Sequence, residues 1–383
     1  MSSRPSAPSL RTSGLSTLNR DHRAGGASRL RDLVPVQRGQ TTRRRLAGAF
    51  PAIAVAVLTA GSLDAIQVEV LRSVGGLPPH IVGTFENAIA YQQASNGSYY
   101  VFDRGGHAVY TVDAGRKVSR KVVDIGQEEG RIIQPTGFDM APDGRFVVAD
   151  VPRAQQRLQT FGPAGERVGG FFLPGRPAAR IILGNLMLNG AGSVQHAGDS
   201  LLLSHPESGS LFTEYSLGGY ARRSIGAMRT TGFEADRDLH VAMNAGVPLV
   251  DPTGGFYYVF ITGTPMFRKY DAAGAVVFER HIQGRELDAF LAAQPSRWPR
   301  RRVEDREVPF VTPVIRAAAV DPAGQLWISL GVPYTYVYDA QGDKTRTVQF
   351  EAAGVLSPTS LFFSARGRLL VTPGCYEFDP TSR

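Results

Sequence analysis

The sequence is poor in the residues and motifs that usually reveal a function. Its 383 residues include one cysteine and two tryptophans. A single cysteine excludes an intramolecular disulfide, so hydrogen bonds and packing must hold the fold, and Cys375 is predicted to be a buried thiol in a strand. No Walker-type phosphate loop, Gly-x-Ser-x-Gly turn, His-Glu-x-x-His helix or Cys-x-x-Cys pair occurs. The local signatures of several large enzyme classes are therefore missing.

The main body of the chain also lacks a charge surplus. The first 45 residues contain ten arginines and two aspartates, and the remaining 32 basic and 32 acidic residues cancel. A nucleic-acid-binding surface needs a local excess of Lys and Arg. The sequence therefore predicts no nucleic-acid partner.

Two segments of different character precede the main body. Residues 1–45 are rich in Ser, Arg, Gly and Pro without apolar periodicity, which predicts a disordered basic leader. Arg43–Arg45 then adjoin an uncharged apolar stretch, residues 46–61, in the layout of a secretory signal. We expect export, with cleavage near residues 60–65. An uncleaved membrane anchor stays open as the alternative, although the stretch is shorter than the ~20 residues of a spanning helix. The protein is thus expected to be periplasmic, extracellular or membrane-anchored by its N-terminus.

A repeated strand pattern fills the rest of the chain. The clearest copy runs from Gly137 to Asp150 and continues from Arg157 to Gly165: an apolar strand, a turn containing Gly144, a Val-rich strand and a third strand with an aromatic residue. Such repeats are typical of β-propeller blades. The pattern predicts an all-β, six-bladed β-propeller over residues 66–383, with four strands in each blade. The other copies begin near Asn87, Ser193, Val247, Ala318 and Ser360.

The last copy ends at Asp379, one strand short of a complete blade. An unpaired strand edge is an aggregation hazard. Ile66–Val70 alternates apolar and polar residues with a period of two, as a half-buried strand does. We therefore expect this N-terminal strand to add to the last blade and close the ring.

The runs Pro142–Asp150 and Arg157–Phe161 resemble the NHL repeat, in which a glycine turn precedes a Val-rich strand ending in Asp and an Arg/aromatic strand follows. The resemblance covers residues 66–379 as architecture and implies a six-bladed propeller. Proteins of this kind range from protein-binding and RNA-binding modules to amidating lyases with a metal at the central channel. The repeat itself carries none of these activities, because its Gly and Asp serve turns and strand ends.

Candidate metal ligands are few, because they must come from inner strand ends of different blades. His196 ends an innermost strand, His80 lies just before the first blade, and Asp139 lies on an innermost strand. Histidine nitrogens suit zinc and carboxylate oxygens suit calcium. Isolated histidines are more often surface or structural residues, so no cofactor is predicted, and zinc or calcium at the central channel is the alternative.

Two insertions interrupt the repeat spacing. Phe171–Leu188 is unusually apolar for a connection, and Gly284–Ala293 is predicted to form a short amphipathic helix before Trp298. Long ordered loops often carry function as rims or lids. The first insertion can equally be a core strand with altered spacing, and the second a solvated flap.

These observations favour an exported, monomeric binding module that recognises a protein or a small-molecule ligand through its loop face. The membrane would be contacted only through the N-terminal segment, if it is uncleaved. The alternative is a metal-dependent lyase or hydrolase with its site at the central channel, which convergent His or Asp side chains would favour. A third alternative is a structural envelope protein without a pocket. The sequence leaves open whether the protein is an enzyme.

Overall fold

The structure is a computed structural model that describes residues 67–174, 180–183, 186–189, 193–303 and 306–382. The predicted leader, residues 1–45, and the predicted signal or anchor, residues 46–61, lie outside the described residues. Among the described residues, no helix is long and apolar enough to cross a membrane.

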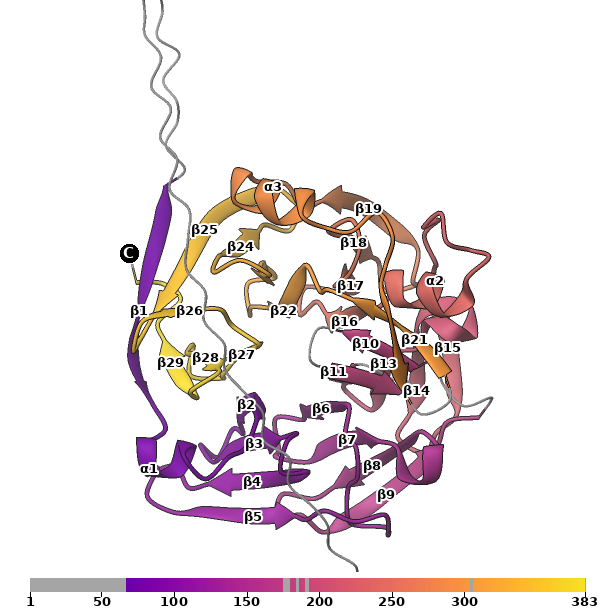
Figure 1. Cartoon of the computed structure of the whole chain (residues 1–383). Helices are drawn as coiled ribbons and strands as arrows, with labels where there is room; N and C mark the ends of the chain where they lie inside the picture. Colours follow the sequence, from indigo (N-terminus) through magenta and orange to yellow (C-terminus); the bar gives the residue numbers. More distant parts are fainter. Residues whose placement is uncertain (1–66, 175–179, 184–185, 190–192, 304–305, 383) are drawn as a thin grey trace, which may run out of the picture. The chain divides into compact units, whose positions relative to one another are not determined.

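Four blades are separate antiparallel sheets of four strands each (Figure 1). The first two consist of β2 (Ala88–Gln93), β3 (Tyr99–Asp103), β4 (Ala108–Val112) and β5 (Ser119–Val123), and of β6 (Gly137–Met140), β7 (Phe146–Asp150), β8 (Arg157–Phe161) and β9 (Arg167–Phe172). The next two consist of β12 (Val194–Ala197), β13 (Ser200–Ser204), β14 (Ser210–Ser216) and β15 (Ala221–Ala227), and of β16 (Gly246–Val250), β17 (Phe256–Phe260), β18 (Met266–Tyr270) and β19 (Val276–His281).

The prediction of six four-stranded blades is wrong. The strands expected to form two further blades belong to one nine-stranded sheet, in the order β22-β23-β24-β25-β1-β29-β28-β27, with β26 paired to β25. The propeller thus has four separate blades and this larger sheet, which lie around a common centre in Figure 1. The strands of the larger sheet are β1 (Val68–Gly76), β22 (Ile315–Val320), β23 (Leu326–Leu330), β24 (Thr335–Tyr338), β25 (Lys344–Glu351), β26 (Val355–Leu356), β27 (Ser360–Phe363), β28 (Leu369–Thr372) and β29 (Tyr376–Phe378).

Strand β1 is the reason that the larger sheet is continuous. Val68–Arg72 pair in parallel with β25, and after a bulge Ser73–Gly76 pair antiparallel with β29. We expected Ile66–Val70 to pair with the last strand, but the paired residues of this segment, Val68–Val70, lie beside β25 instead. Without β1, the long strand β25 would have an unpaired edge. Strand β1 covers this edge and also pairs with β29.

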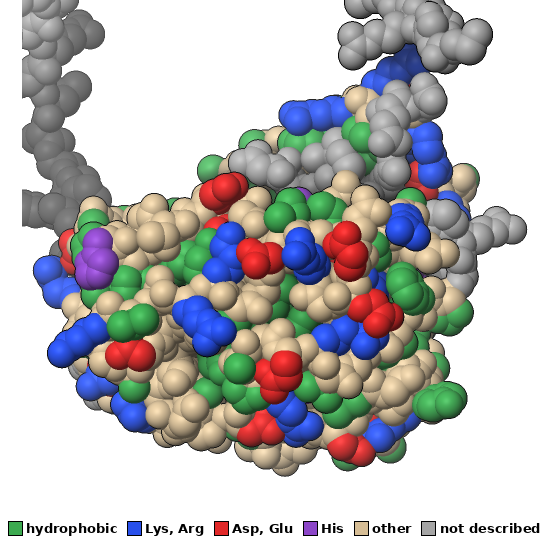
Figure 2. All heavy atoms as spheres, turned by 90° about the horizontal axis from the view of Figure 1, so that it is seen from below, with side chains coloured by type: hydrophobic (Ala, Val, Ile, Leu, Met, Phe, Trp, Pro, Cys, Tyr) green, Lys and Arg blue, Asp and Glu red, His purple; other side chains and the backbone are tan. Residues whose placement is uncertain are grey.

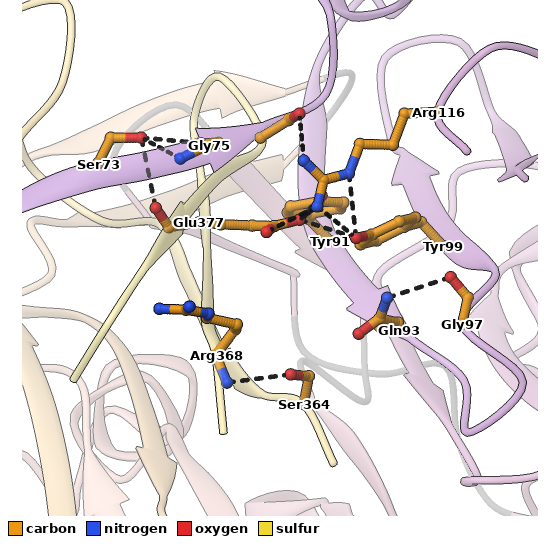
Figure 3. Close-up of polar contacts among 11 residues, drawn as sticks. Ser73, Gly75, Tyr91, Gln93, Gly97, Tyr99, Arg116, Ser364, Arg368 and Glu377 are labelled. Atoms are coloured by element: carbon orange, nitrogen blue, oxygen red, sulfur yellow. Dashed lines mark hydrogen bonds and ion pairs between the residues drawn. The ribbon is translucent and has the colours of Figure 1, made fainter. Parts of the chain in front are cut away.

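A buried polar network joins the larger sheet to the first blade (Figure 3). Arg116 Nη2 donates to Glu377 Oε2 at 2.8 Å, and the hydroxyls of Tyr91 and Tyr99 donate to Glu377 Oε1 at 3.2 and 2.9 Å. Burial raises the pKa of Tyr91, which keeps its hydroxyl protonated as a donor. Every oxygen of the Glu377 carboxylate thus has a partner, and we interpret the network as structural.

The core lies between neighbouring sheets, and the second strand of each of the four blades is buried throughout. Phe102 of β3 stacks on Phe138 of β6 with ring centroids 5.2 Å apart, and Phe138 contacts Phe146 of β7 at 5.7 Å. Gly144, in the turn before β7, has a φ of 88°, which favours glycine. Cys375 is buried as predicted, but it lies in the turn before β29 and not in a strand, and burial raises its thiol pKa to about 12.

The two insertions meet in one sheet. The accessory sheet, as we call it, contains β10 (Arg180–Leu183) and β11 (Leu186–Asn189) at the first insertion, and β20 (Arg300–Val303) and β21 (Arg306–Val311), which follow the second insertion in the chain. Strand β10 pairs in parallel with β21, with Ile182 opposite Phe310. Short connections lead from β11 to β12 and from β21 to β22, so the accessory sheet stands on the face of the ring where these innermost strands begin.

The described residues also form three α-helices, α1 (Pro79–Val82), α2 (Arg237–Met243) and α3 (Arg285–Ala292), and two short 3-10 helices, Pro152–Ala154 and Pro206–Ser208. Helix α2 packs its buried Leu239 in one cluster with Val311 of β21. Helix α3 confirms the helix predicted over Gly284–Ala293. Its Leu287 is fully buried, so α3 is packed onto the propeller and is not a solvated flap.

The surface carries charges of both signs. Figure 2 shows one face, where Lys and Arg side chains are interleaved with Asp and Glu among apolar and neutral groups. Several charged side chains of the described surface form ion pairs, such as Arg222 with Asp199 at 2.7 Å. This mixture is what the cancelling charges of the sequence lead one to expect.

Candidate ligand site in the central channel

A cavity of about 560 Å³ lies at the centre of the ring, between the innermost strands β2, β6, β12, β16, β22 and β27. Pockets for small molecules usually measure roughly 300–1,000 Å³ and combine apolar walls with a few polar groups. The cavity fits this description. Its apolar wall includes Ile89, Phe138, Val194, Leu249 and Leu361, and its polar or charged side chains include Gln92, Asp139, Gln195, His196 and Arg316.

The carboxylate of Asp139 joins three neighbouring innermost strands. Its Oδ2 accepts the backbone N–H of His196 at 2.7 Å, and its Oδ1 accepts from Gln92 Nε2 at 2.9 Å. Because the channel-facing edge of an innermost strand has no further strand to pair with, its N–H groups need such partners. Gln195 has the same role between β12 and β16, where its Oε1 accepts the backbone N–H of Val250 at 2.6 Å. The role of Asp139 is therefore partly structural.

Other polar atoms at the same place have no partner. Both ring nitrogens of His196 and the Oε1 atom of Gln92 are buried and without a hydrogen bond among the residues that the structure describes. Asp139 itself forms no ion pair within those residues. A buried polar atom left without a partner costs about 1–3 kcal/mol, so such atoms usually meet water or a ligand. Their convergence distinguishes this wall of the channel from the rest.

Burial sets the protonation of the pair. It raises the pKa of the Asp139 carboxyl, against the neighbouring His196 and the hydrogen bonds from His196, Gln92 and Met140, and it lowers the pKa of the His196 imidazole. Neutral imidazole offers one N–H donor and one nitrogen acceptor. At neutral pH, His196 therefore presents one of each to the channel wall without adding charge.

The structure brings together two of the three predicted site residues. Asp139 and His196 lie side by side at the channel, whereas His80 lies in α1, is exposed and does not line the cavity. Within the described ranges, no group of three or more His, Cys, Asp or Glu side chains could hold a metal ion. Zinc sites in proteins normally take three or four protein ligands. Asp139 and His196 provide two, so the described residues alone do not fit a resident zinc ion.

Sequence reasoning missed Gln92, Gln195 and Arg316. They lie on three different innermost strands, and nothing in their local sequence distinguishes them from surface polar residues. The available signal was their position in the repeat, because each lies on the strand that precedes the first turn of its copy. An alignment of the repeat copies with one another would have placed these three residues at the channel.

No family model matches the chain, and no curated protein matches it at a significant level. Among solved structures, it is similar to a streptogramin B lyase, with 10% identity, 77% of this chain and 93% of that chain covered, and a TM-score of 0.47. It is also similar to virginiamycin B lyase from Staphylococcus aureus (10%, covering 75% and 78%, TM-score 0.45) and to the WD40 β-propeller domain of Doa1 (8%, covering 82% and 97%, TM-score 0.44). At these values the likenesses say nothing about function, and they show no specific relation to NHL proteins.

Proposed function

We propose that this protein is an exported binding protein that holds a small polar ligand in the central channel. The observation that carries the proposal is the cavity wall at Asp139, where the unpartnered atoms of His196 and Gln92 converge. Export is supported by the arginine-flanked apolar stretch at residues 46–61. The NHL-like repeat of the second blade fits this proposal, because propellers of that kind include binding modules.

The fold suits such a function because the site is built on strands. Gln92, Asp139 and His196 lie on β2, β6 and β12, each of which is paired in its own sheet. Side chains held by rigid elements lose little freedom when a ligand binds, and this lowers the cost of association. The ligand would enter from the loop face, on which the accessory sheet stands.

A thermal-shift screen of small polar molecules tests the proposal. Ala318 of β22 lines the cavity, so Ala318→Phe should narrow the channel and abolish the stabilisation given by any true ligand. Ala273 lies in an exposed turn, and Ala273→Phe should leave that stabilisation unchanged. The proposal fails if no molecule stabilises the protein, or if the molecules that do so act equally on Ala318→Phe.

The alternative of a metal-dependent lyase or hydrolase has its own test, elemental analysis of protein purified without chelator. With two ligands at the channel, we expect less than stoichiometric zinc or calcium. Stoichiometric metal that Asp139→Ala or His196→Ala removes, and that the exposed control His80→Ala retains, would favour the enzyme instead.

A further inference from the structure

The groups at the two ends of the channel define the chemistry of the ligand, an inference that rests on the proposed function. The end of the cavity at Asp139, which we call the inner end, is rich in hydrogen-bond acceptors. These are the Asp139 carboxylate, the unpartnered Gln92 Oε1 and one nitrogen of neutral His196. A carboxylate has about four acceptor positions, and the donors His196, Gln92 and Met140 leave at least one of those of Asp139 free. The structural role of Asp139 therefore leaves an acceptor position free for a ligand.

A cationic nitrogen complements these acceptors best. An ammonium group carries three donors, and its hydrogen bonds to a carboxylate are roughly twice as strong as neutral ones. Asp139 forms no ion pair with a Lys or Arg of the described chain, so a ligand cation would supply the missing full charge. The cavity also has apolar wall residues, such as Ile89 and Leu249, which suit a hydrocarbon segment.

The other end of the site is marked by Arg316. This residue lines the cavity, is exposed, and donates one long hydrogen bond, from Nη2 to the Gly331 carbonyl at 3.4 Å. It forms no ion pair with the residues that the structure describes. A guanidinium group placed in this way is suited to bind a carboxylate or another small anion.

The repeat gives the separation between the two ends. Met140 pairs with Phe146 just before the turn of the second blade, as Val320 pairs with Leu326 in β22 and β23. Asp139 therefore corresponds to Ala319, and Arg316 lies three residues earlier on its strand, at the bulge between Ile315 and Ala317. At about 3.3 Å per regular residue, and less across the bulge, the two levels are about 7–10 Å apart along the channel.

We propose that the ligand is an elongated zwitterion, with a cationic nitrogen bound at Asp139, Gln92 and His196, an anionic group bound at Arg316, and a short apolar segment between them. The inner end selects the cation by acceptors and charge. The outer end selects the anion near the face through which the ligand enters.

A matched series of probes tests this inference by calorimetric titration of the protein. The zwitterions 4-aminobutanoate, 6-aminohexanoate and 8-aminooctanoate are compared with hexanoate, which lacks the amine, and hexylamine, which lacks the carboxylate. We expect at least one zwitterion to bind, and both single-charge probes to bind at least about tenfold more weakly, because each loses one set of charge-assisted hydrogen bonds.

Two variants assign each charge to its residue. Asp139→Asn should remove the preference for the zwitterion over hexanoate, and Arg316→Gln should remove its preference over hexylamine. Arg120→Gln, on the exposed outer strand β5, should change neither. Equal binding of hexanoate and the zwitterions would overturn the inference. So would the failure of the whole series while a screened molecule still binds in a manner sensitive to Ala318→Phe, and in that case the proposed function would stand.

Discussion

Replacing Arg157 by leucine should lower the free energy of unfolding by about 3–5 kcal/mol. Arg157 Nε and Nη2 donate to the two oxygens of Asp150 at 2.9 and 2.6 Å, and both side chains are almost completely buried, 4% and 0% exposed. The same guanidinium donates to backbone carbonyls of the preceding loop, including that of Arg131 at 2.9 Å. The variant would leave the Asp150 carboxylate buried without its cation, and leave these carbonyls without a donor.

Urea denaturation measures the effect, with Arg145→Leu as the matched control. Arg145 pairs with Asp143 at 2.7 Å, but their side chains are 47% and 52% exposed. An exposed pair of this kind contributes about 0–1 kcal/mol. If the two variants lose the same stability, burial does not give the Arg157–Asp150 pair its importance.

Deleting Val68–Arg72 from the full chain should abolish cooperative unfolding of the propeller or lower its midpoint sharply. The deletion removes the parallel pairing with β25, the ion pair of Glu69 with Arg346 at 2.7 Å, and the side chain of Leu71, which is 1% exposed. Thermal unfolding followed by circular dichroism measures the result.

Point substitutions separate packing from pairing in the same strand. Leu71→Ala should lower the free energy of unfolding by about 2–5 kcal/mol, as buried leucines do. Val70 is 46% exposed, and Val70→Ala should have a much smaller effect. Unchanged unfolding of the deletion variant would show that β1 is not needed to close the ring.

The sequence predicted strands well because strand signals are local. The turn at Gly144 and the Val-rich run after it placed β7 correctly, and the amphipathic pattern of Gly284–Ala293 placed α3. The number of blades was wrong because it depends on pairing between distant strands. Nothing in the alternation of Ile66–Val70 distinguishes β25 from β29 as a partner. Because β1 lies between these two strands and pairs with both, the two expected blades form one sheet.

Prediction of the candidate site also succeeded where the signal was local and failed where it depended on distant segments. Asp139 and His196 were predicted to lie at inner strand ends, and the structure brings them together. His80 was chosen by its closeness in sequence to the first blade, but a short helix, α1, carries it to the surface. Placing Gln92 and Arg316 at the channel requires the alignment of the repeat copies with one another, which the pattern of one strand does not contain.

The position of β1 also bears on how the protein reaches its native state during synthesis. Glu69 of β1 and Arg346 of β25 are 277 residues apart, and β29 follows β25 in the chain. The ribosome therefore completes β25 only after synthesising a further 277 residues beyond Glu69, so the ring cannot close before then. Contacts between such distant segments also form slowly. Until β25 is complete, β1 has neither of its partner strands, and the ring of sheets remains open.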